Sequence, residues 1–509
     1  MSRGRQDGAV SDRLRRLGAA FEHAGYTVDG VRALLGPVAG GALARDEIVP
    51  ALRATGGGSP LEALTRLFWL QVPVVSPAGG FADDLVAAGL AEASGGEVRA
   101  LLRVEPLEAV APEPGGGGHL GYVVSDLKVR PGGGAVRPDH VVGAGGASAS
   151  LARLLVHSYP EPVDNALDLG TGCGVQALHL AGRARRVTAT DVNPRALELA
   201  AASLALSGAE DAEFVEGPLL EPVAGRRFDL IVSNPPFVIT PPDSGTRYVY
   251  RESGLPGDEF CRRLVVAARG HLNEGGHCRL LANWLQVKDV PWEERVGAWV
   301  EESGCDAWVV RRDVQDPAEY AELWLRDSCE VGTPEYRTRY EAWLDYFERH
   351  GVTGVGFGWI VLRRTDSARP VTRVEELRHA VGQPVGAYVD QILDGLTAAR
   401  EFSTSCGQEL FERRLRTAAG IVQEQIGPPG AEHPERILLR QDERLRRAAG
   451  VGTVEAALAG VCDGTLPLGR LLDAIAQLTD LDSEQVREHA RAVLPELIAD
   501  GFFELAPEP

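Results

Sequence analysis

The segment NALDLGTGCG, residues 165–174, begins as an apolar strand and turns through three glycines. The following VQALHLAGRA, residues 175–184, has the spacing of a helix. Gly170, Gly172 and Gly174 let the backbone pass close to a ligand, and the first helical turn leaves N–H groups free to bind it. The segment therefore predicts a ligand-binding turn, although a purely structural turn and a dinucleotide-binding turn share this pattern.

Outward from this turn, strands and helices alternate over residues 120–366, which predicts a parallel sheet with crossover helices. On either side, residues 1–112 and 370–509 read as mainly helical domains, each ending in short strands like a winged helix. We therefore expect an α/β protein with three domains. Seven strands are expected, at residues 165–170, 186–191, 212–217, 228–234, 277–283, 307–312 and 356–364.

The composition is that of an ordinary globular protein of 509 residues, with a formal net charge of -20. This acidity argues against a broad nucleic-acid groove, but not against a local basic patch. The seven cysteines form no Cys-x-x-Cys pair and the eleven histidines show no metal-ligand spacing, so we expect reduced thiols and no metal. No apolar segment suggests a signal peptide or a membrane span, and we expect a cytoplasmic protein.

Asp191 ends the second expected strand, about twenty residues beyond the glycine turn. A carboxylate at this position accepts hydrogen bonds from ribose hydroxyls, which indicates a ligand with a ribose. Dinucleotide-binding enzymes have the same acid, so this residue alone does not identify the ligand.

The segment FDLIVSNPPF, residues 228–237, places Asn234, Pro235, Pro236 and Phe237 directly after an apolar strand. Two prolines restrict the backbone, so the Asn234 side-chain oxygen and nearby carbonyls are aimed in a fixed direction. Such acceptors can hold an amino group, and Phe237 offers a face for a planar amide or base. The segment predicts a site that orients a nitrogen atom.

Together, DLGTGCG at 168–174, TATD at 188–191 and SNPPF at 233–237 resemble class I S-adenosyl-L-methionine-dependent methyltransferases of the small-domain type. The release-factor glutamine N5-methyltransferases and the ribosomal RNA guanine-N2 enzymes are the most similar groups. The resemblance implies a Rossmann-like seven-stranded sheet, S-adenosyl-L-methionine as cofactor, and a target nitrogen held by residues 234–237. The implied cofactor-binding residues are Asp168, Gly170, Thr171, Gly172, Gly174, Asp191, Val192, Asn193, Glu216, Gly217 and Asn234.

Three further segments are candidate parts of the same site. Residues 141–155 resemble the stretch that closes over the methionine end of the cofactor, or are a glycine-rich loop and helix cap. Residues 238–260, with Arg247, Tyr248, Tyr250 and Arg251, read as a substrate lid or a plain surface loop. Asn283 and Trp284 either line the pocket or belong to the core. Because Pro218 stands where related enzymes often have an acid, we expect the adenine contact to shift to Glu216 or to backbone.

The methyl acceptor stays open between a protein amide or small molecule, an RNA or DNA base, and no acceptor at all if the chain is a non-catalytic cofactor-binding scaffold. The intact SNPPF segment argues against the scaffold. The flanking domains are candidate surfaces for a homodimer or for nucleic acid. Acidic residues interleave a group of arginines that we expect in helical stretches and on a solvated face, namely Arg413, Arg414, Arg416, Arg440, Arg444, Arg446 and Arg447.

Overall fold

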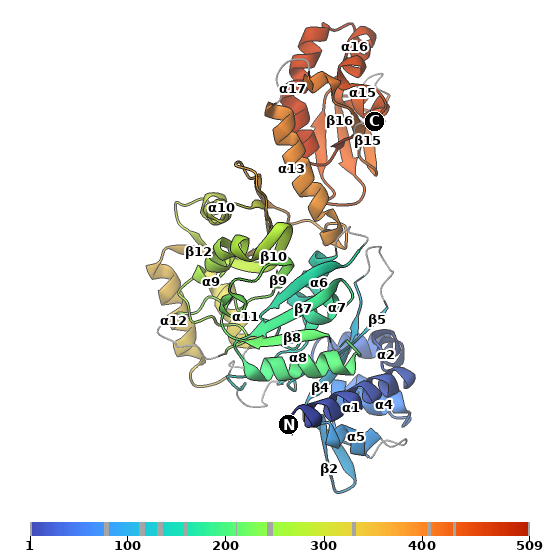
Figure 1. Ribbon diagram of the computed structural model, residues 1–509, viewed down its shortest axis with the longest axis vertical. Helices are drawn as coiled ribbons and strands as arrows, with labels where there is room; N and C mark the ends of the chain where they lie inside the picture. Colours follow the sequence, from blue (N-terminus) through green and yellow to red (C-terminus); the bar gives the residue numbers. More distant parts are fainter. Residues whose placement is uncertain are drawn as a thin grey trace.

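A central α/β unit carries one further region at each end of the chain (Figure 1). The computed structural model describes residues 3–75, 81–110, 118–129, 136–156, 161–209, 211–241, 248–327, 332–404, 409–430 and 434–506. Arg247, Cys329 and Cys406 lie outside these residues. No helix in the described part of the chain is both long and apolar enough to cross a membrane.

The centre is an eight-stranded sheet in the order β13-β11-β12-β10-β9-β6-β7-β8. The strand β12 is antiparallel to both its neighbours, and the remaining neighbours pair in parallel. The strands are β6 (Val163–Leu169), β7 (Ala184–Asp191), β8 (Ala212–Glu216), β9 (Phe228–Ser233), β10 (Leu272–Val287), β11 (Asp306–Gln315), β12 (Val352–Arg363) and β13 (Thr372–Glu376).

The predicted α/β class and all seven predicted strand positions are confirmed. The predicted number of strands is wrong by one, because β13 adds to the sheet beside β11. Its five residues are half exposed at the sheet edge and carry charged side chains, so they lack the apolar run of a central strand. The sheet therefore continues beyond residue 370, where we expected the C-terminal domain to begin.

Helices cover both faces of the sheet, as the alternation of side chains along β6 requires. Ala166 packs into the core beneath α7 and α8, whereas Leu167 and Leu169 pack into the core beneath α9 and α10. These helices are α7 (Val175–Ala181), α8 (Pro194–Leu206), α9 (Glu259–Ala268) and α10 (Trp292–Ser303), with α6 (Gly146–Leu155) preceding the sheet and short 3-10 turns at Glu221–Val223 and Arg269–His271.

The N-terminal region is helical at first and ends in strands. The sequence EVRALLRVEPL, residues 97–107, reads as a single strand, but the structure has two. The chain bends at Leu101 and Leu102, whose N–H groups both donate to the Leu90 carbonyl at 3.0 and 3.3 Å. The elements are α1 (Arg3–His23), α2 (Val28–Leu43), α3 (Val49–Ala54), α4 (Pro60–Leu64), a π-helical turn (Thr65–Trp69), β1 (Val74–Val75), α5 (Phe81–Ala87), β2 (Ala91–Ser94), β3 (Glu97–Ala100), β4 (Arg103–Glu108) and β5 (His119–Ser125).

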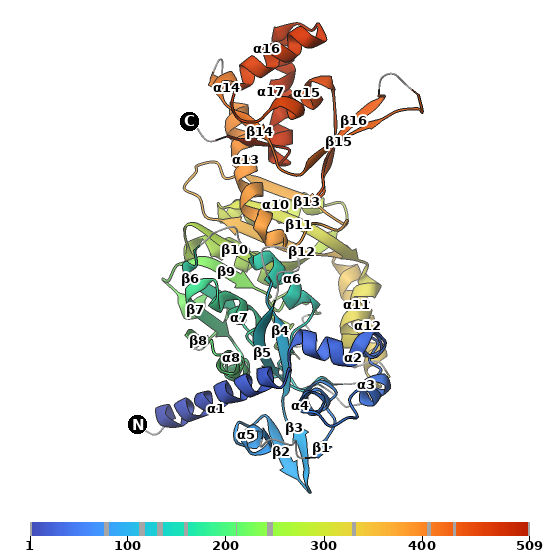
Figure 2. The same ribbon diagram turned by 90° about the vertical axis from the view of Figure 1, so that its right-hand side faces the viewer.

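This region shares one hydrophobic core with α7 and α8. Helix α1 lies along α8 (Figures 1 and 2) so closely that a Cβ added at Gly18 would lie 1.8 Å from the Leu206 carbonyl oxygen. The backbone N–H groups of Tyr122 and Val124 on β5 donate to the hydroxyls of Ser207 and Ser203, each at 2.8 Å. The N-terminal region is thus fixed against the central sheet.

The C-terminal region has its own hydrophobic core. The predicted series of helices followed by a short strand is confirmed by α15 (Thr453–Val461), α16 (Leu468–Thr479), α17 (Ser483–Ala499) and β18 (Phe503–Leu505). The region is less helical than expected, because β15 (Ile421–Ile426), β16 (Arg436–Gln441) and β17 (Ala448–Val451) form a sheet that projects from it (Figure 2). The other elements are the 3-10 turn Val385–Tyr388, α13 (Val389–Thr404), α14 (Glu409–Glu412) and β14 (Leu415–Thr417).

The prediction that the C-terminal arginines lie in helices is wrong. Arg416 and Arg440 lie on β14 and β16, and Arg444 lies in the turn after β16. They pair with carboxylates, as in the 2.8 Å contacts of Arg416 with Glu504 and of Arg440 with Glu424. Arg416 and Arg440 meet these carboxylates through the pairing of strands, which the spacing of residues along a helix does not predict.

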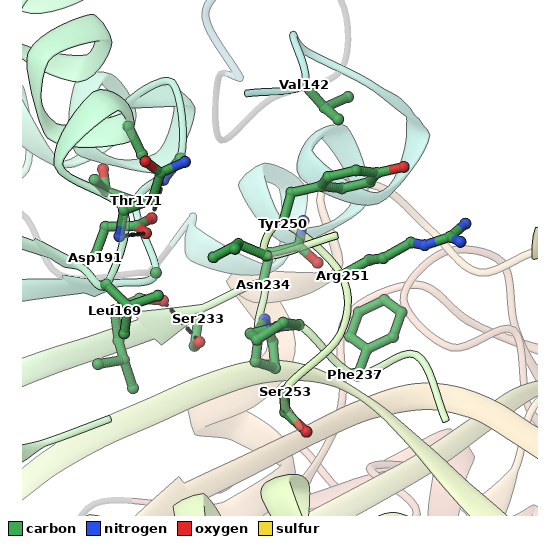
Figure 3. A pocket seen from close by; sticks show the side chains of 18 of the residues that line it. Val142, Leu169, Thr171, Asp191, Ser233, Asn234, Phe237, Tyr250, Arg251 and Ser253 are labelled. Atoms are coloured by element: carbon green, nitrogen blue, oxygen red, sulfur yellow. Dashed lines mark hydrogen bonds between the residues drawn. The ribbon is translucent and has the colours of Figure 1, made fainter. Parts of the chain in front are cut away.

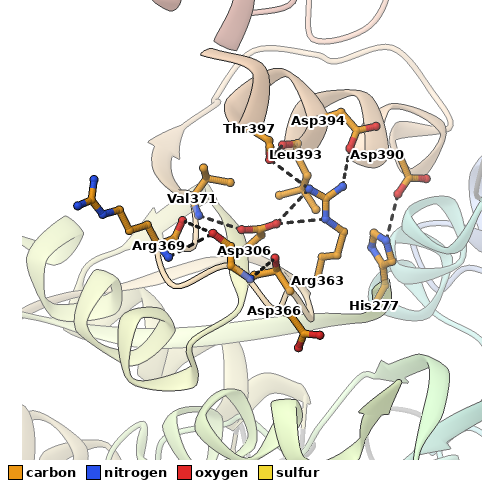
Figure 4. Close-up of polar contacts among 12 residues, drawn as sticks. His277, Asp306, Arg363, Asp366, Arg369, Val371, Asp390, Leu393, Asp394 and Thr397 are labelled. Carbon is orange, nitrogen blue, oxygen red and sulfur yellow. Dashed lines mark hydrogen bonds and ion pairs between the residues drawn. The ribbon is translucent and has the colours of Figure 1, made fainter. Parts of the chain in front are cut away.

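Helix α13 joins the C-terminal region to the sheet. Its first half packs on the sheet and its second half packs in the C-terminal core. Figure 4 shows Arg363 of β12 reaching Asp306 of β11 at 3.0 Å and Asp394 of α13 at 2.5 Å. His277 Nε2 lies 3.1 Å from the carboxylate of Asp390, one helical turn before Asp394.

Candidate functional site

A cavity of about 680 Å³ lies at the carboxyl edge of the sheet, where the strand order reverses between β6 and β9. Ligands of open α/β sheets bind in this position, and the volume suits a small organic molecule. The cavity brings together most of the residues predicted from sequence. Lining it are Gly170, Thr171, Gly172, Asp191, Val192, Asn193, Gly217, Asn234, Pro235, Pro236 and Phe237.

Asp168 is not among the lining residues and is only 1% exposed. Its Oδ2 accepts hydrogen bonds from the Thr171 hydroxyl at 2.6 Å and from the Ala177 N–H at 2.9 Å. Burial raises the pKa of this carboxyl to about 7. Asp168 thus holds the glycine turn and the start of α7 in place from below.

Gly174 also lies off the cavity, and the packing of two helices explains its residue type. Its φ is 85°, and a Cβ added there would lie 3.1 Å from the Ala200 Cα of α8. Gly172 has a φ of 54° and directs its N–H to Asp191 Oδ2 at 3.0 Å. Both positions therefore require glycine, but only Gly172 faces the ligand space.

Asp191 is tied to the turn on one side and to α8 on the other. Its second oxygen accepts the Asn193 N–H at 2.9 Å. Burial raises the pKa of the Asp191 carboxyl above its ordinary value. A carboxylate offers about four lone-pair positions, so Asp191 can accept further hydrogen bonds from a ligand in the cavity.

Asn234 follows the last residue of β9, and the Ser233 hydroxyl fixes that end by donating to the Leu169 carbonyl at 2.8 Å. The side-chain oxygen of Asn234 is buried and accepts no hydrogen bond from the described residues. A buried acceptor without a donor costs about 1–3 kcal/mol. Asn234 thus lines the cavity and has an acceptor that no described residue uses.

The cavity has two sides. Figure 3 shows Thr171 and Asp191 on one side of Asn234, and Phe237, Tyr250 and Arg251 on the other. The second side is closed by the segment after the motif, because the Val238 N–H donates to the Arg251 carbonyl at 2.9 Å. Residues 249–253 of the expected lid line the cavity, as do Leu255 and Phe260.

Among the lining residues that sequence reasoning missed are Trp324 and Asp327 at the end of α11 (Pro317–Asp327). This helix and α12 (Tyr336–Arg349) form an insertion between β11 and β12. The Arg251 guanidinium is 3% exposed, donates to the Trp324 carbonyl at 2.7 Å and lies 5.7 Å from the Trp324 ring. Nothing in the sequence near Trp324 signals this contact.

The segment before the first strand also closes over the cavity, as one of its two interpretations expected. Residues 140–143 and 145–148 line it, and the Gln176 side chain donates to the Ser148 carbonyl at 2.8 Å. At the end of β8, Gly217, Pro218 and Leu219 line the cavity, whereas Glu216 is exposed and does not. At the position where we expected Glu216 or the backbone to contact the adenine, the cavity is thus lined by backbone and apolar groups and not by Glu216.

Asn283 and Trp284 belong to the core. Asn283 is 1% exposed and donates to the Tyr320 hydroxyl at 3.2 Å, which in turn accepts the Ile239 N–H at 2.9 Å. Trp284 is fully buried and stacks on Trp292 with ring centroids 5.5 Å apart. Among the described residues, no group of three or more His, Cys, Asp or Glu side chains could hold a metal ion.

Comparison with known families gives two matches. Residues 147–298, which contain the glycine turn, Asp191 and the Asn234 motif, match the family described as "Methyltransferase small domain". This segment is thus similar to methyltransferase small domains. Residues 23–101 match a domain of unknown function, DUF7059, which covers most of the N-terminal region.

Curated relatives match about a quarter to a third of the chain. The release factor glutamine methyltransferase of Deinococcus radiodurans is 38% identical over 145 residues, covering 27% of this chain and 51% of the relative. The ribosomal RNA small subunit methyltransferase C of Cronobacter sakazakii is 33% identical over 165 residues, covering 32% and 42%. The chain thus spans about half the length of the curated relatives it matches.

Among solved structures, a putative methyltransferase from Bacillus halodurans is 17% identical, with a TM-score of 0.28, covering 43% of this chain and 97% of that chain.

Proposed function

We propose that this protein transfers a methyl group from S-adenosyl-L-methionine to an amide or planar amine nitrogen held by Asn234. The observation that carries the proposal is Asn234, which lines the same cavity as Asp191 and whose buried side-chain oxygen has no donor among the described residues. The names of the relatives support it, since they are methyltransferases for glutamine or for ribosomal RNA.

The residues on the Asp191 side fit such a cofactor. Asp191 can accept hydrogen bonds from a ribose, and the polar turn at Thr171 and Gly172 suits the amino-acid end. Leu219 and Pro218 offer apolar surface for a flat base. S-adenosyl-L-methionine supplies an electrophilic methyl group on a sulfonium, so the protein mainly has to align the acceptor.

Alignment is what the Asn234 motif can provide. An amide nitrogen is a weak nucleophile because its lone pair is delocalised into the carbonyl group. When Asn234 Oδ1 accepts an N–H of the acceptor, it fixes the rotation of that nitrogen and draws electron density onto it. Pro235 and Pro236 restrict the backbone that carries Asn234, so the acceptor is held in one orientation.

The wall on the other side excludes water from this nitrogen. Tyr248, Tyr250 and Trp324 contribute rings around the buried Arg251, and Phe237 lines the cavity on the same side. A closed wall prevents water from competing for the Asn234 oxygen. The nitrogen becomes acidic as the N–C bond forms, so it loses its proton to solvent on product release and no lining residue has to act as a strong base.

A protein amide or small molecule is the acceptor class that we favour over an RNA or DNA base. Nucleic-acid binding depends on unpaired basic side chains, and four of the seven C-terminal arginines, Arg416, Arg440, Arg444 and Arg447, are engaged with carboxylates. The net charge of -20 points the same way. A base acceptor remains the alternative outcome of the experiment below.

The test is transfer of a tritiated methyl group from S-adenosyl-L-methionine into fractionated lysate of a strain that lacks the protein. We expect label in the protein or metabolite fraction, and label in RNA or DNA alone would replace the acceptor class. Asn234→Ala is expected to abolish transfer while titration calorimetry shows cofactor affinity within about 2-fold of wild type. Asp191→Ala is expected to weaken cofactor binding at least about 10-fold, as loss of charge-assisted hydrogen bonds does.

Full transfer by Asn234→Ala would contradict the role of the motif. Tight cofactor binding without label in any fraction would instead support a non-catalytic scaffold.

A further inference from the structure

A second cavity, of about 320 Å³, adjoins the first where the N-terminal region meets the central sheet. Five residues line both cavities, namely His140, Val142, Gly143, Tyr250 and Asp327. Figure 3 shows Val142 near Tyr250, on the side of Asn234 away from Asp191. A molecule bound beside Phe237 can therefore extend into the second cavity without crossing the cofactor side.

The basic side chains of this second cavity are already paired. Arg103 of β4 lies 2.6 Å from Glu105 Oε1, and Lys128 lies 2.6 Å from Asp46. Arg103 is also mostly buried, so its charge is neutralised locally. The cavity thus offers little to attract a phosphate or a carboxylate.

All three acidic residues on its wall have a partner, Glu105 through Oε1 alone. Asp126 forms an ion pair with Arg195 and accepts the Val141 N–H at 2.9 Å. Asp327 accepts the Tyr250 hydroxyl at 3.1 Å. These carboxylates hold the walls of the two cavities together.

Glu105 differs from both. The residue is 8% exposed, and its Oε2 is buried without a hydrogen-bond partner among the described residues. This oxygen points at the shared wall, because a Cβ added at Gly143 would lie 2.5 Å from it. A buried carboxylate oxygen without a donor is costly, so the geometry suits a ligand that brings an N–H group.

We propose that this second cavity, the Glu105 pocket, extends the acceptor site and that Glu105 accepts a hydrogen bond from an N–H group of a polypeptide acceptor. The inference rests on the proposed function and deepens it by naming the acceptor class. Backbone amides, lysine and arginine supply such donors on either side of a target residue. Nucleic-acid phosphates only accept hydrogen bonds and are repelled by a carboxylate.

Glu105→Gln tests the pocket directly. The substitution keeps the shape of the side chain, removes its negative charge and replaces one carboxylate oxygen by an amino group. The substrate is the unmethylated form of the protein fraction that takes up label. We expect its half-saturating concentration to rise roughly 10-fold while the plateau rate stays within about 2-fold. Glu108→Gln, on the exposed end of the same strand, is the matched control and should leave both values unchanged. An unchanged half-saturating concentration in a folded Glu105→Gln variant overturns the proposal.

Ala144→Phe is a second route if Glu105→Gln fails to fold. Ala144 is exposed and lines only the second cavity, so a large ring there narrows the pocket without touching the Arg103 pair. We expect the same rise in half-saturating concentration, with unchanged affinity for S-adenosylhomocysteine by calorimetry. An unaltered half-saturating concentration here also counts against the pocket.

A binding experiment separates failure of this inference from failure of the proposed function. Lysine amide is titrated into wild type saturated with S-adenosylhomocysteine, with glutamate amide as the charge-reversed probe. We expect lysine amide to bind in the millimolar range and to lose at least about 10-fold in affinity in Glu105→Gln. If lysine amide does not bind, or if label enters only RNA or DNA, the polypeptide pocket is wrong. If no fraction takes up label, the proposed function is wrong. The titration then still shows whether the Glu105 pocket binds lysine amide.

Discussion

The hydroxyl of Tyr250 donates a hydrogen bond to Asp327 Oδ2 at 3.1 Å, and so joins the segment after the Asn234 motif to the end of α11. The Tyr250 pKa is raised by burial, with Asp327 contributing, so the phenol stays protonated and acts as donor at neutral pH. This contact closes the wall on the side where we place the methyl acceptor.

Tyr250→Phe removes that hydrogen bond and keeps the ring. We expect the KM for the acceptor to rise about 2- to 10-fold, the range of one net hydrogen bond, because the segment is held less firmly. Cofactor affinity should not change, since Tyr250 lies away from Asp191. Steady-state kinetics with the unmethylated form of the fraction that takes up label measure the KM, and calorimetry measures the cofactor affinity. If Tyr250→Phe lost cofactor binding but kept its KM for the acceptor, Tyr250 would belong to the cofactor side of the cavity, and our assignment would be wrong.

Asp168→Asn should flatten the dependence of stability on pH. Burial raises the pKa of the folded Asp168 carboxyl from 3.8 to about 7, so the folded state binds its proton more tightly than the unfolded state does. Wild-type stability contributed by this group is therefore present below pH 4 and is lost as pH rises to about 7, on the order of a few kcal/mol. Asn keeps one oxygen for Thr171 and Ala177 and has no such loss.

Thermal unfolding of both proteins between pH 4 and 8 measures this effect. The difference in Tm between Asp168→Asn and wild type should move in favour of the variant as pH rises. A constant difference across the range would mean that the carboxyl titrates normally.

Gly174→Ala should destabilise the protein by about 1–3 kcal/mol. Alanine at this position would have to adopt a φ of 85°, and its Cβ would lie 3.1 Å from the Ala200 Cα. Gly182→Ala, at the other end of α7, is the matched control, because its φ is -89° and no atom lies within 4 Å of the added Cβ. Denaturant unfolding compares the two, and equal stability of both variants would contradict the packing explanation.

Arg363→Met should cost about 3 kcal/mol, because it leaves the buried Asp306 carboxylate without its cation. The same change at Arg337, whose pair with Glu341 is exposed on α12, should have no measurable effect. Chemical unfolding of both variants measures the contrast. Similar behaviour of the two would show that the contacts of β12 with β11 and α13 in Figure 4 contribute little to stability.

The sequence by itself determined the parts of the site that are local along the chain. The apolar run around Leu167 identified β6, and Gly172 and Asp191 could be paired because a strand, a turn and a second strand follow one another along the chain. Asn234 could be placed because it ends an apolar strand, and all parallel strands of a sheet present that end at one edge. These arguments need only the period of a strand and the order of the elements.

Only the tertiary structure decided what faces these residues from afar. Trp324, Asp327 and Glu105 reach the two cavities from elements distant in sequence, and each lies in an unremarkable local pattern. The structure also moved Asp168 from the cavity wall to the support beneath it, because a side chain's neighbours depend on which face of β6 it occupies. Burial and pairing arise from packing between distant segments, and no local pattern records them.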